Sequence, residues 1–205
     1  MDKDTPLSTG KLRGRPSKFN HENALKAALN VFWAQGYEGT SMTDLTEALG
    51  INKPSIYAAF GNKEALFKKA LSKYASETVN FLPDAIKAPT AKKVVELFLC
   101  DAAEFLTNPD TPQGCLIVQG ALACSKDAEP IKQLLIEYRK NLELTLVDRF
   151  ELAKNQGDLP SNTNCENLAK LISTIHQGMC VQAKSGAGKA ELLGIARIVL
   201  ESNIF

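Results

Sequence analysis

The pentapeptide KPSIY, which begins at Lys53, carries polar side chains of the types that bind duplex DNA. Lys53 can reach a phosphate or a guanine edge, and Tyr57 offers its ring to a sugar and its hydroxyl to a phosphate. Pro54 and Ser55 keep the surface between them small, and Lys63 adds a cation at the start of the next predicted helix. We expect this segment to enter a major groove. The alternative is an ordinary corner between two helices with a solvated polar face.

Cys115 is the second group that could do chemistry. It lies near the predicted N-terminus of a helix, where the helix dipole lowers the pKa of a thiol and favours the reactive thiolate. This placement predicts a sensor of oxidants or electrophiles; the alternative is a small buried hydrophobe. The chain has five cysteines and no CxxC spacing, which argues against both a disulfide framework and a zinc site.

Two patterns that could indicate an enzyme are rejected. His176 could act as a base for a cysteine, but no orienting acid or oxyanion element is evident, and a hydrogen-bonded structural role fits this histidine better. The hexapeptide SGAGKA resembles a phosphate-binding loop, but Ala183 and Ala190 stand where the Walker pattern needs Gly and Ser or Thr. We interpret its glycines as a loop between two helices. We therefore expect no enzymatic activity, no cofactor and no metal.

Helix-capping signals surround the KPSIY segment. Gly50 can supply the positive φ of a tight turn. Asn20, Asn52 and Asn62 can each cap the helix that follows, and Ser41 with Asp44 resembles a capping box. Pro54 falls in the first turn of the helix after Asn52, where its missing N–H would have had no partner. Apolar residues facing inward on both sides of the turn would hold the two short helices together as a helix-turn-helix. The helices expected in this part are His21–Gln35, Ser41–Leu49, Lys53–Ala59 and a long one, Lys63–Phe81, closed by Pro83.

The remainder of the chain also has helical spacing, without strand-period alternation. We predict an all-α fold of about nine helices, in which an N-terminal three-helix helix-turn-helix domain precedes a larger C-terminal helical bundle. The proposed divisions are a flexible basic arm (1–18), a DNA-binding domain (19–65) and a C-terminal ligand-binding and dimerisation domain (66–205). The further helices expected are Ala91–Leu106, Gln113–Ala123, Glu129–Asn155, Asn164–Ala183 and Lys189–Ser202.

Composition is that of an ordinary globular protein. The 205 residues are 44% hydrophobic and 23% charged, which suits one or two domains with a real core. Residues 1–74 contain 11 Lys and Arg against 7 Asp and Glu, whereas residues 75–205 contain 13 against 16. An anionic partner would therefore dock on the N-terminal part. Without a long apolar run or a signal segment, we expect a soluble cytoplasmic protein with no membrane partner.

The stretch from Ala28 to Leu71, ALNVFWAQGYEGTSMTDLTEALGINKPSIYAAFGNKEALFKKAL, resembles the DNA-binding domain of the TetR/AcrR family of transcriptional repressors. The matching elements are the run from Phe32 to Tyr37, the pair Thr40-Ser41, the ALGI turn, the KPSIY segment and the FGNKEAL entry to the next helix. The resemblance implies the all-helical layout for the rest of the chain. It also implies a C-terminal half whose sequence differs with the ligand that it binds.

The same resemblance implies roles for individual residues. Thr40 and Ser41 would contact phosphate, Lys53, Pro54 and Ser55 would approach bases, and Tyr57 and Lys63 would grip the backbone. Separately, the segment RGRP resembles the core of an AT-hook, in which Arg13 and Arg15 would lie in a narrow A·T-rich minor groove. The alternative is a basic tail that adds non-specific affinity for phosphates.

Two groups of apolar residues in the C-terminal half have expected roles. The resemblance implies that the last two helices, whose apolar faces are broad, pair with a second copy in a four-helix interface. The residues assigned to this homodimer are Leu168, Leu171, Ile175, Leu192, Ile195 and Val199. The core of the middle helices could hold a small apolar effector. The residues assigned to it are Phe98, Phe105, Cys115, Tyr138, Leu142 and His176.

These observations favour a ligand-responsive DNA-binding regulator. Its simplest form is a repressor that binds a palindromic operator as a dimer and is released by a small apolar or reactive molecule. The alternative is a thiol-based redox or electrophile sensor that acts through Cys115 on the same scaffold. A third class, an architectural DNA-binding protein, would bind duplexes without operator preference.

Overall fold

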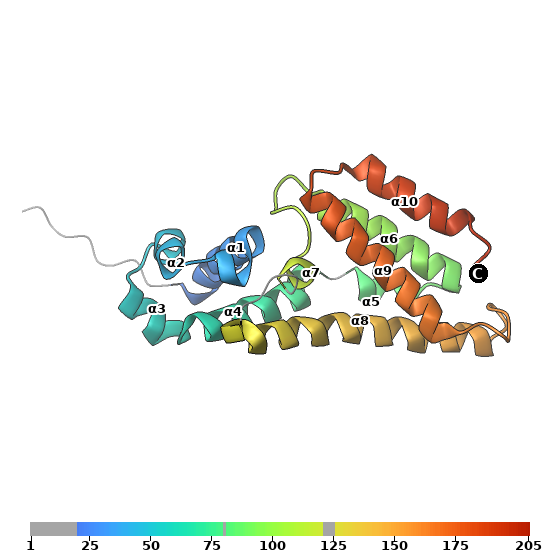
Figure 1. Ribbon diagram of the computed structural model, residues 1–205, viewed down its shortest axis with the longest axis horizontal. Coiled ribbons are helices and arrows are strands. Elements are labelled where there is room, and N and C mark those ends of the chain that lie inside the picture. Colours follow the sequence, from blue (N-terminus) through green and yellow to red (C-terminus); the bar gives the residue numbers. More distant parts are fainter. Residues whose placement is uncertain (1–19, 80, 121–125) are drawn as a thin grey trace, which may run out of the picture.

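The computed structural model describes residues 20–79, 81–120 and 126–205, and these residues are helical without strands, as predicted. Four helices, α1 (His21–Gly39), α2 (Met42–Leu49), α3 (Lys53–Phe60) and α4 (Lys63–Lys73), form an N-terminal bundle. Figure 1 shows α2 and α3 at the end of the molecule that lies farthest from the C-terminal helices. This end is therefore free to meet a partner.

Side chains begin all four of these helices, which explains why the sequence defines their starts so well. Asn20, Asn52 and Asn62 each accept hydrogen bonds from backbone N–H groups of the first turn that would otherwise have no partner. Ser41 and Asp44 form the predicted capping box at the start of α2. At the other end of α2, Gly50 has a φ of 65°, the left-handed conformation that the tight turn requires.

The long helix predicted over Lys63–Phe81 is shorter in the structure. The α-helix α4 ends at Lys73 and widens into a π-helical turn, Tyr74–Thr78. Pro83 does not close that helix but lies in the first turn of a separate short helix, α5 (Leu82–Ala85). Proline is tolerated there because the first N–H groups of a helix have no intrahelical partner.

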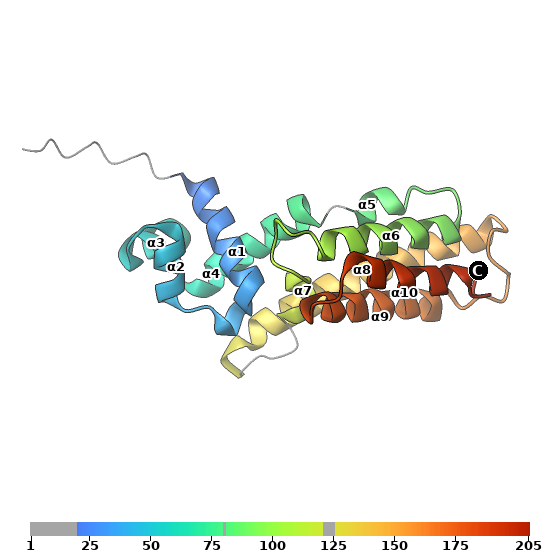
Figure 2. The same ribbon diagram turned by 90° about the horizontal axis from the view of Figure 1, so that it is seen from above.

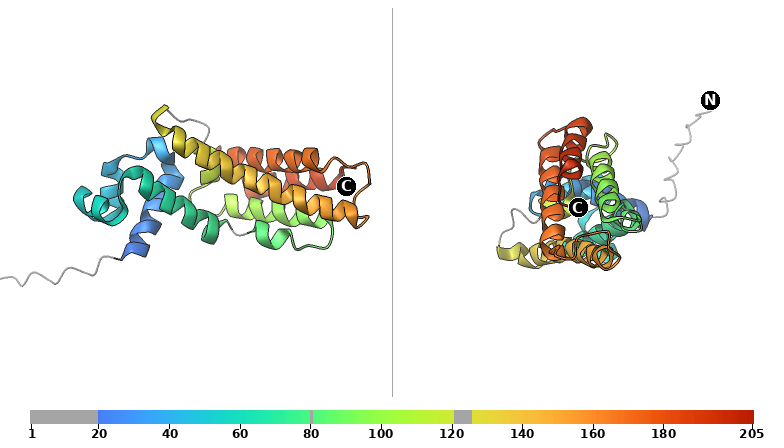
Figure 3. Two further views of the ribbon diagram at one scale, coloured as in Figure 1. Left: turned by 90° about the horizontal axis from the view of Figure 1, so that it is seen from below. Right: turned by 90° about the vertical axis from the view of Figure 1, so that its right-hand side faces the viewer.

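The C-terminal bundle is built from four long helices and two short ones. After α5 come α6 (Ala91–Leu106), α7 (Leu116–Gln119), α8 (Glu129–Asn155), α9 (Cys165–Lys184) and α10 (Lys189–Glu201). Along this bundle, α10 packs on α6 and α8 packs on α9. Figures 2 and 3 show these helices roughly aligned with the long axis of the molecule, with α8 running along its length. The expected bounds of α6 and α8 are those of the structure.

The helix predicted over Gln113–Ala123 is mostly absent from the described residues. Only Leu116–Gln119 forms a helical turn, and residues 121–125 lie outside the described part of the chain. Gly114 has a φ of 83°, which a helix cannot accommodate. Its carbonyl oxygen accepts a hydrogen bond from the indole of Trp33, so the loop is committed to a contact with α1.

The two bundles share one hydrophobic core. At their junction, the ring of Trp33 stacks on Phe105 with centroids 5.5 Å apart and meets Tyr74 edge-on at 4.9 Å. The hydroxyl of Tyr74 accepts a hydrogen bond of 3.3 Å from the backbone N–H of Leu116. We call this junction the seam: Trp33 of α1, Tyr74 after α4, Phe105 of α6 and the backbone of residues 114–116. The seam connects the C-terminal bundle to the helices that carry α3.

Replacing Gly114 with alanine tests the seam. A Cβ at this position would lie 1.8 Å from the side-chain amide nitrogen of Gln119 and 3.2 Å from the backbone carbonyl oxygen of Cys180. The positive φ would also strain an alanine backbone. Gly157→Ala is the matched control, because Gly157 has a similar φ of 79° and open space around it. We expect the control to lose about 1 kcal/mol of unfolding free energy in urea, and Gly114→Ala to lose about 1–2 kcal/mol more. Equal losses would contradict the tight packing at residue 114.

Candidate functional site

The helix α3 is fixed from inside and at both ends. Ile56 and Phe60 are buried against the rest of the N-terminal bundle. At the start, the side-chain oxygen of Asn52 accepts a hydrogen bond of 2.9 Å from the N–H of Ser55, while Pro54 lies in the first turn. Gly61 ends the helix with a φ of 84°. Because both ends and the inner face are held, the outer face is presented in one orientation.

The outer face of α3 contains the predicted DNA-binding residues. Lys53, Pro54, Ser55 and Tyr57 are all exposed, and Tyr57 keeps 50% of its surface in solvent. The first turn of α3 has no acidic residue, so no nearby carboxylate offsets the positive end of its dipole. This combination suits a polyanion. We call α2, α3 and the start of α4 the reading head.

Thr40 and Ser41, two further predicted contacts just before α2, differ from each other in the structure. Ser41 is exposed at the start of α2, where its hydroxyl accepts from the N–H of Asp44 at 3.1 Å. Thr40 is only 1% exposed, and its hydroxyl donates to the carbonyl oxygen of Gly36 at 2.7 Å. The expected phosphate contact by the Thr40 side chain is therefore corrected: this hydroxyl is bonded to Gly36, where a φ of 74° and a ψ of 173° interrupt the helical geometry of α1. Arg13 and Arg15 lie outside the described residues.

Lys63 is held by an aromatic residue that the sequence did not single out for a role. Its Nζ lies 4.4 Å from the ring centroid of Tyr37, a cation–π contact. The ring of Tyr37 is fixed in turn by Phe32 and Phe67. Partial burial lowers the pKa of Lys63, although the carboxylates of Glu38 and Asp44 act in the opposite direction. Tyr37 and Lys63 are too far apart in sequence for helical spacing to have revealed this pair.

The predicted effector residues lie in two places. Cys115, Tyr138, Leu142 and His176 line a cavity of about 40 Å³ between α7, α8 and α9. Phe98 and Phe105 belong instead to the aromatic packing beneath it, where Phe98 lies 4.9 Å from the ring of His176. A cavity of this volume holds one or two water-sized molecules, whereas drug-sized ligands need roughly 300 Å³ or more. An effector of that size would have to enlarge it.

Cys115 lies beside a second thiol. Hydrogen bonding from the Cys180 thiol lowers the pKa of Cys115 to about 7, burial opposes this shift, and the Tyr74 hydroxyl also lowers it. The pKa of Cys180 is raised by the same interaction and by burial. The backbone N–H groups of Ile117 and Val118 contribute less. The sequence predicted a lowered pKa from a helix N-terminus, but the larger cause is Cys180, sixty-five positions away.

His176 is buried in the position expected for a structural histidine. Its Nε2 lies 3.7 Å from the sulfur of Cys180, and its ring packs against Phe98 and Phe81. Burial lowers the pKa of His176 to about 4, so the ring is neutral at physiological pH. It lines the cavity as an uncharged polar group.

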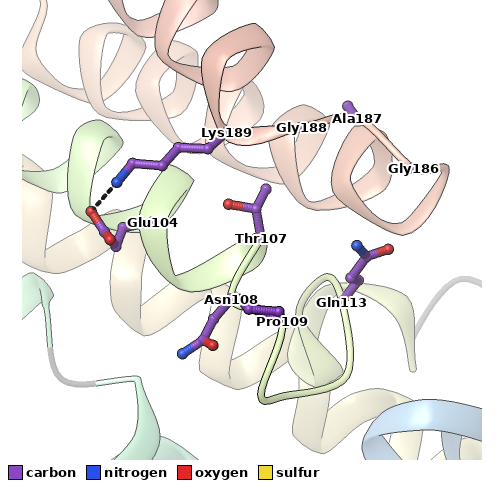
Figure 4. Close-up of a pocket in the computed structure, with 9 residues that line it drawn as sticks. All are labelled: Glu104, Thr107, Asn108, Pro109, Gln113, Gly186, Ala187, Gly188 and Lys189. Carbon is purple, nitrogen blue, oxygen red and sulfur yellow. Dashed lines mark hydrogen bonds and ion pairs between the residues drawn. The ribbon is translucent and has the colours of Figure 1, made fainter.

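A separate surface hollow lies where two loops meet, shown in Figure 4. Its volume is about 350 Å³, and two of its lining residues, Lys189 and Glu104, form an ion pair of 2.6 Å. One wall is the loop of residues 185–188, which connects α9 to α10 as the sequence indicated. The N–H of Gly188 is bonded to the carboxylate of Glu191, so this helix start is capped by its own chain. The hollow therefore lacks the free donors of a phosphate loop.

The predicted dimer surface is only partly on the outside. Leu168, Leu192 and Val199 are buried in the chain's own core, which corrects their assignment to an outer face. Ile175 and Ile195 are half-buried. The large apolar side chains that remain exposed on α9 and α10 are Leu171 (42%), Val181 (43%) and Ile198 (71%). Three of the apolar side chains expected on the outside of α9 and α10 instead pack into the core of the chain, whereas Leu171 and other apolar side chains of the same two helices are exposed.

The described residues contain neither a metal-binding cluster nor a membrane-spanning helix. Within residues 20–79, 81–120 and 126–205, no group of three or more His, Cys, Asp or Glu side chains could hold a metal ion. Over the same residues, no helix is long and apolar enough to cross a membrane.

Known proteins resemble this chain along nearly its whole length. Residues 24–70 match the protein family described as "Bacterial regulatory proteins, tetR family". Residues 92–192 match the family described as "Tetracyclin repressor-like, C-terminal domain". The HTH-type transcriptional repressor ComR of Escherichia coli (strain K12) is 33% identical over 204 residues, covering 98% of this chain and 96% of that protein. The repressor BdcR of the same organism is 29% identical, covering 92% and 91%.

A solved structure gives the same result in three dimensions. A cysteine mutant of the TetR family transcriptional regulator CifR, complexed with 26-bp double-strand operator DNA, is 35% identical and superimposes with a TM-score of 0.88. The match covers 92% of this chain and 100% of that chain. The similarity therefore includes both bundles and their arrangement.

Protonation of His176 is expected to destabilise the chain below neutral pH. Its pKa is about 4 in the folded state and about 6.5 when unfolded, so the unfolded chain binds more protons between these values. Stability is then complete above about pH 6.5 and falls by roughly 3 kcal/mol towards pH 4. In urea unfolding at several pH values, His176→Gln should flatten this dependence. His21→Gln, which retains His176, should keep it; an unchanged slope in His176→Gln would contradict the assignment.

Proposed function

The chain belongs to the TetR family of bacterial regulatory proteins, and we propose that it is a dimeric repressor that releases a palindromic operator when a small molecule binds its C-terminal bundle. The observation that carries this proposal is the reading head. A capped helix presents Lys53, Ser55 and Tyr57 outward at the end of the molecule. The curated relatives ComR and BdcR are transcriptional repressors, and CifR is complexed with operator DNA.

The chemistry of the head suggests how it would bind a duplex. α3 would enter the major groove with its N-terminal end near the bases, so that Lys53 and Ser55 reach base edges. Tyr57 and Lys63 would contact the phosphate backbone on either side. Tyr37 holds the Lys63 ammonium in place, which reduces the side-chain entropy lost on binding. Ser41, at the exposed start of α2, is positioned for a further phosphate.

A two-fold dimer would match the symmetry of a palindrome. The exposed apolar side chains of α9 and α10, Leu171, Val181 and Ile198, offer a surface that a second copy would cover. Pairing through these helices would leave both reading heads free. Two recognition helices about 34–36 Å apart would reach successive major grooves on one side of the DNA.

Release requires that the effector bind the DNA-free form more tightly than the DNA-bound form. The seam is the structural route for this coupling, because residues 114–116 contact both Trp33 of α1 and Tyr74 after α4. Enlarging the cavity beside Cys115 would displace these residues and tilt the head. The same position favours a second candidate trigger, direct modification of the Cys115 thiol.

Two substitutions test the reading head with a duplex selected by the protein. Lys63→Ala should weaken binding by about 10-fold and lower the slope of log K against log salt concentration by about one, because one phosphate contact is lost. Tyr57→Ala should weaken binding to all sequences similarly. Lys87→Ala, an exposed lysine on the C-terminal bundle, is the control and should bind as the wild type does. Unchanged affinity and salt slope in Lys63→Ala would contradict its assignment.

A charge on the exposed apolar surface tests the dimer. Ile198→Glu should shift the protein to monomer in sedimentation velocity at micromolar concentration, because a carboxylate would be buried without a partner in the interface. Leu152→Glu on α8 is the matched control, since Leu152 is similarly apolar and 49% exposed. We expect the control to remain dimeric. A dimer that tolerates Ile198→Glu but not Leu152→Glu would place the interface elsewhere.

A further inference from the structure

Two cysteines that are far apart in sequence meet in the core beside the seam. Cys115 precedes α7 and Cys180 lies in α9, and both are buried. The backbones approach closely here, since a Cβ on Gly114 would lie 3.2 Å from the carbonyl oxygen of Cys180. The thiols interact directly, and the Tyr74 hydroxyl also contacts Cys115. Neither the family descriptions nor the names of the relatives assign a role to this pair.

The cavity of about 40 Å³ gives a small solute access to Cys115. Its outer wall is formed by the half-buried residues Tyr138, Arg139 and Gln177. Arg139 adds positive charge and donates to the carbonyl oxygen of Ile117 at 3.5 Å. The neutral ring of His176 lines the inner wall. The volume suits a molecule little larger than water, such as hydrogen peroxide, and excludes bulky electrophiles.

The remaining described cysteines lack these features. Burial, and after it the carboxylate of Glu96, raises the pKa of Cys100. Burial likewise raises the pKa of Cys165, and Glu151 adds to the effect. A raised pKa leaves less thiolate for reaction with an oxidant. Cys115 is therefore the described thiol best prepared to react, and Cys180 is the thiol placed to react next.

We propose that Cys115 and Cys180 form a dithiol that reacts with hydrogen peroxide and closes to an intramolecular disulfide. The Cys115 thiolate attacks one oxygen of hydrogen peroxide, the O–O bond breaks, and the other oxygen leaves as water, taking up the thiol proton. The Cys180 sulfur then attacks the sulfenic acid on Cys115. The S–O bond breaks, the S–S bond forms, and the hydroxide leaves as water with the Cys180 proton. Two thiols are oxidised while one peroxide is reduced.

The disulfide would change the seam directly. Drawing the Cys115 sulfur onto Cys180 removes the thiol that Tyr74 contacts, while the adjoining backbone of Gly114 and Leu116 is bonded to Trp33 and Tyr74. Trp33 belongs to α1, which packs on α2 and α4, and Tyr74 continues α4, whose start belongs to the reading head. The step from disulfide to operator affinity rests on the proposed function. The chemistry of the dithiol does not.

The chemical claim is tested on the full-length reduced protein without DNA. Treated with a small excess of hydrogen peroxide, the wild type and the control Cys165→Ser should each lose about 2 Da, and peptide mapping should place the disulfide between Cys115 and Cys180. Cys180→Ser should stop at a sulfenic acid on Cys115, trapped by dimedone. Cys115→Ser should form neither product at these positions. Absence of the 115–180 disulfide in the wild type, or of the dimedone adduct in Cys180→Ser, would overturn the proposal.

The consequence is tested by operator binding of the reduced and oxidised protein. We expect oxidation to weaken binding by about 10-fold or more in the wild type and in Cys165→Ser, and to leave Cys180→Ser close to its reduced affinity. Equal affinities of the reduced and disulfide forms would overturn the link to the reading head. If the disulfide forms but neither form binds any selected duplex, the repressor function fails and the dithiol stands. If the reduced protein binds operator and no disulfide forms, the dithiol fails and the repressor stands.

A final variant tests the route through Tyr74. Tyr74→Phe removes only the hydroxyl that contacts Cys115 and the N–H of Leu116. It should still form the 115–180 disulfide, but the accompanying change in operator affinity should be smaller than in the wild type. A change as large as that of the wild type would overturn this route.

Discussion

The rest of the structure depends on one contact between the two bundles, the hydrogen bond of 2.9 Å from the indole N–H of Trp33 to the carbonyl oxygen of Gly114. Both groups are buried, so leaving either without a partner would cost free energy. The bond fixes the loop before α7 against α1, and the rings of Tyr74 and Phe105 pack around it. Because α1 packs on α2 and α4, which belong to the reading head, the proposed coupling would carry a displacement of residues 114–116 to the head.

The sequence predicted those features that depend on neighbouring residues along the chain, such as helix caps and tight turns. Asn20, Asn52 and Asn62 cap helices where they were expected, and the capping box and Gly50 define α2. Predictions from the sequence were wrong where contacts between distant residues determine the structure. The π-helical turn at Tyr74 and the short α7 both lie at the seam, and helical spacing did not indicate either. Likewise, the exposed positions of Lys53, Ser55 and Tyr57 followed from spacing, whereas the burial of Thr40 and the pairing of Cys115 with Cys180 required the folded chain.

The two halves of the molecule use polar groups for different purposes. In the reading head the polar groups are exposed and held by caps, so that their geometry is ready before DNA arrives. In the C-terminal bundle a few polar groups, Tyr74, Cys115, His176 and Cys180, are buried together beside a small cavity. Groups buried this way are costly unless they bond to one another, so they are sensitive to any change in one member. The seam places this cluster next to the helices that carry the head.

The most direct test of the central claim is selection of duplexes from a random-sequence library by the full-length reduced protein at about 150 mM salt, followed by sequencing. A dimer with two rigid α3 helices predicts enrichment of an inverted repeat whose half-sites lie about one helical turn apart. Enriched sequences without inverted symmetry would contradict the dimeric arrangement. No enrichment over unselected DNA would contradict the reading head itself.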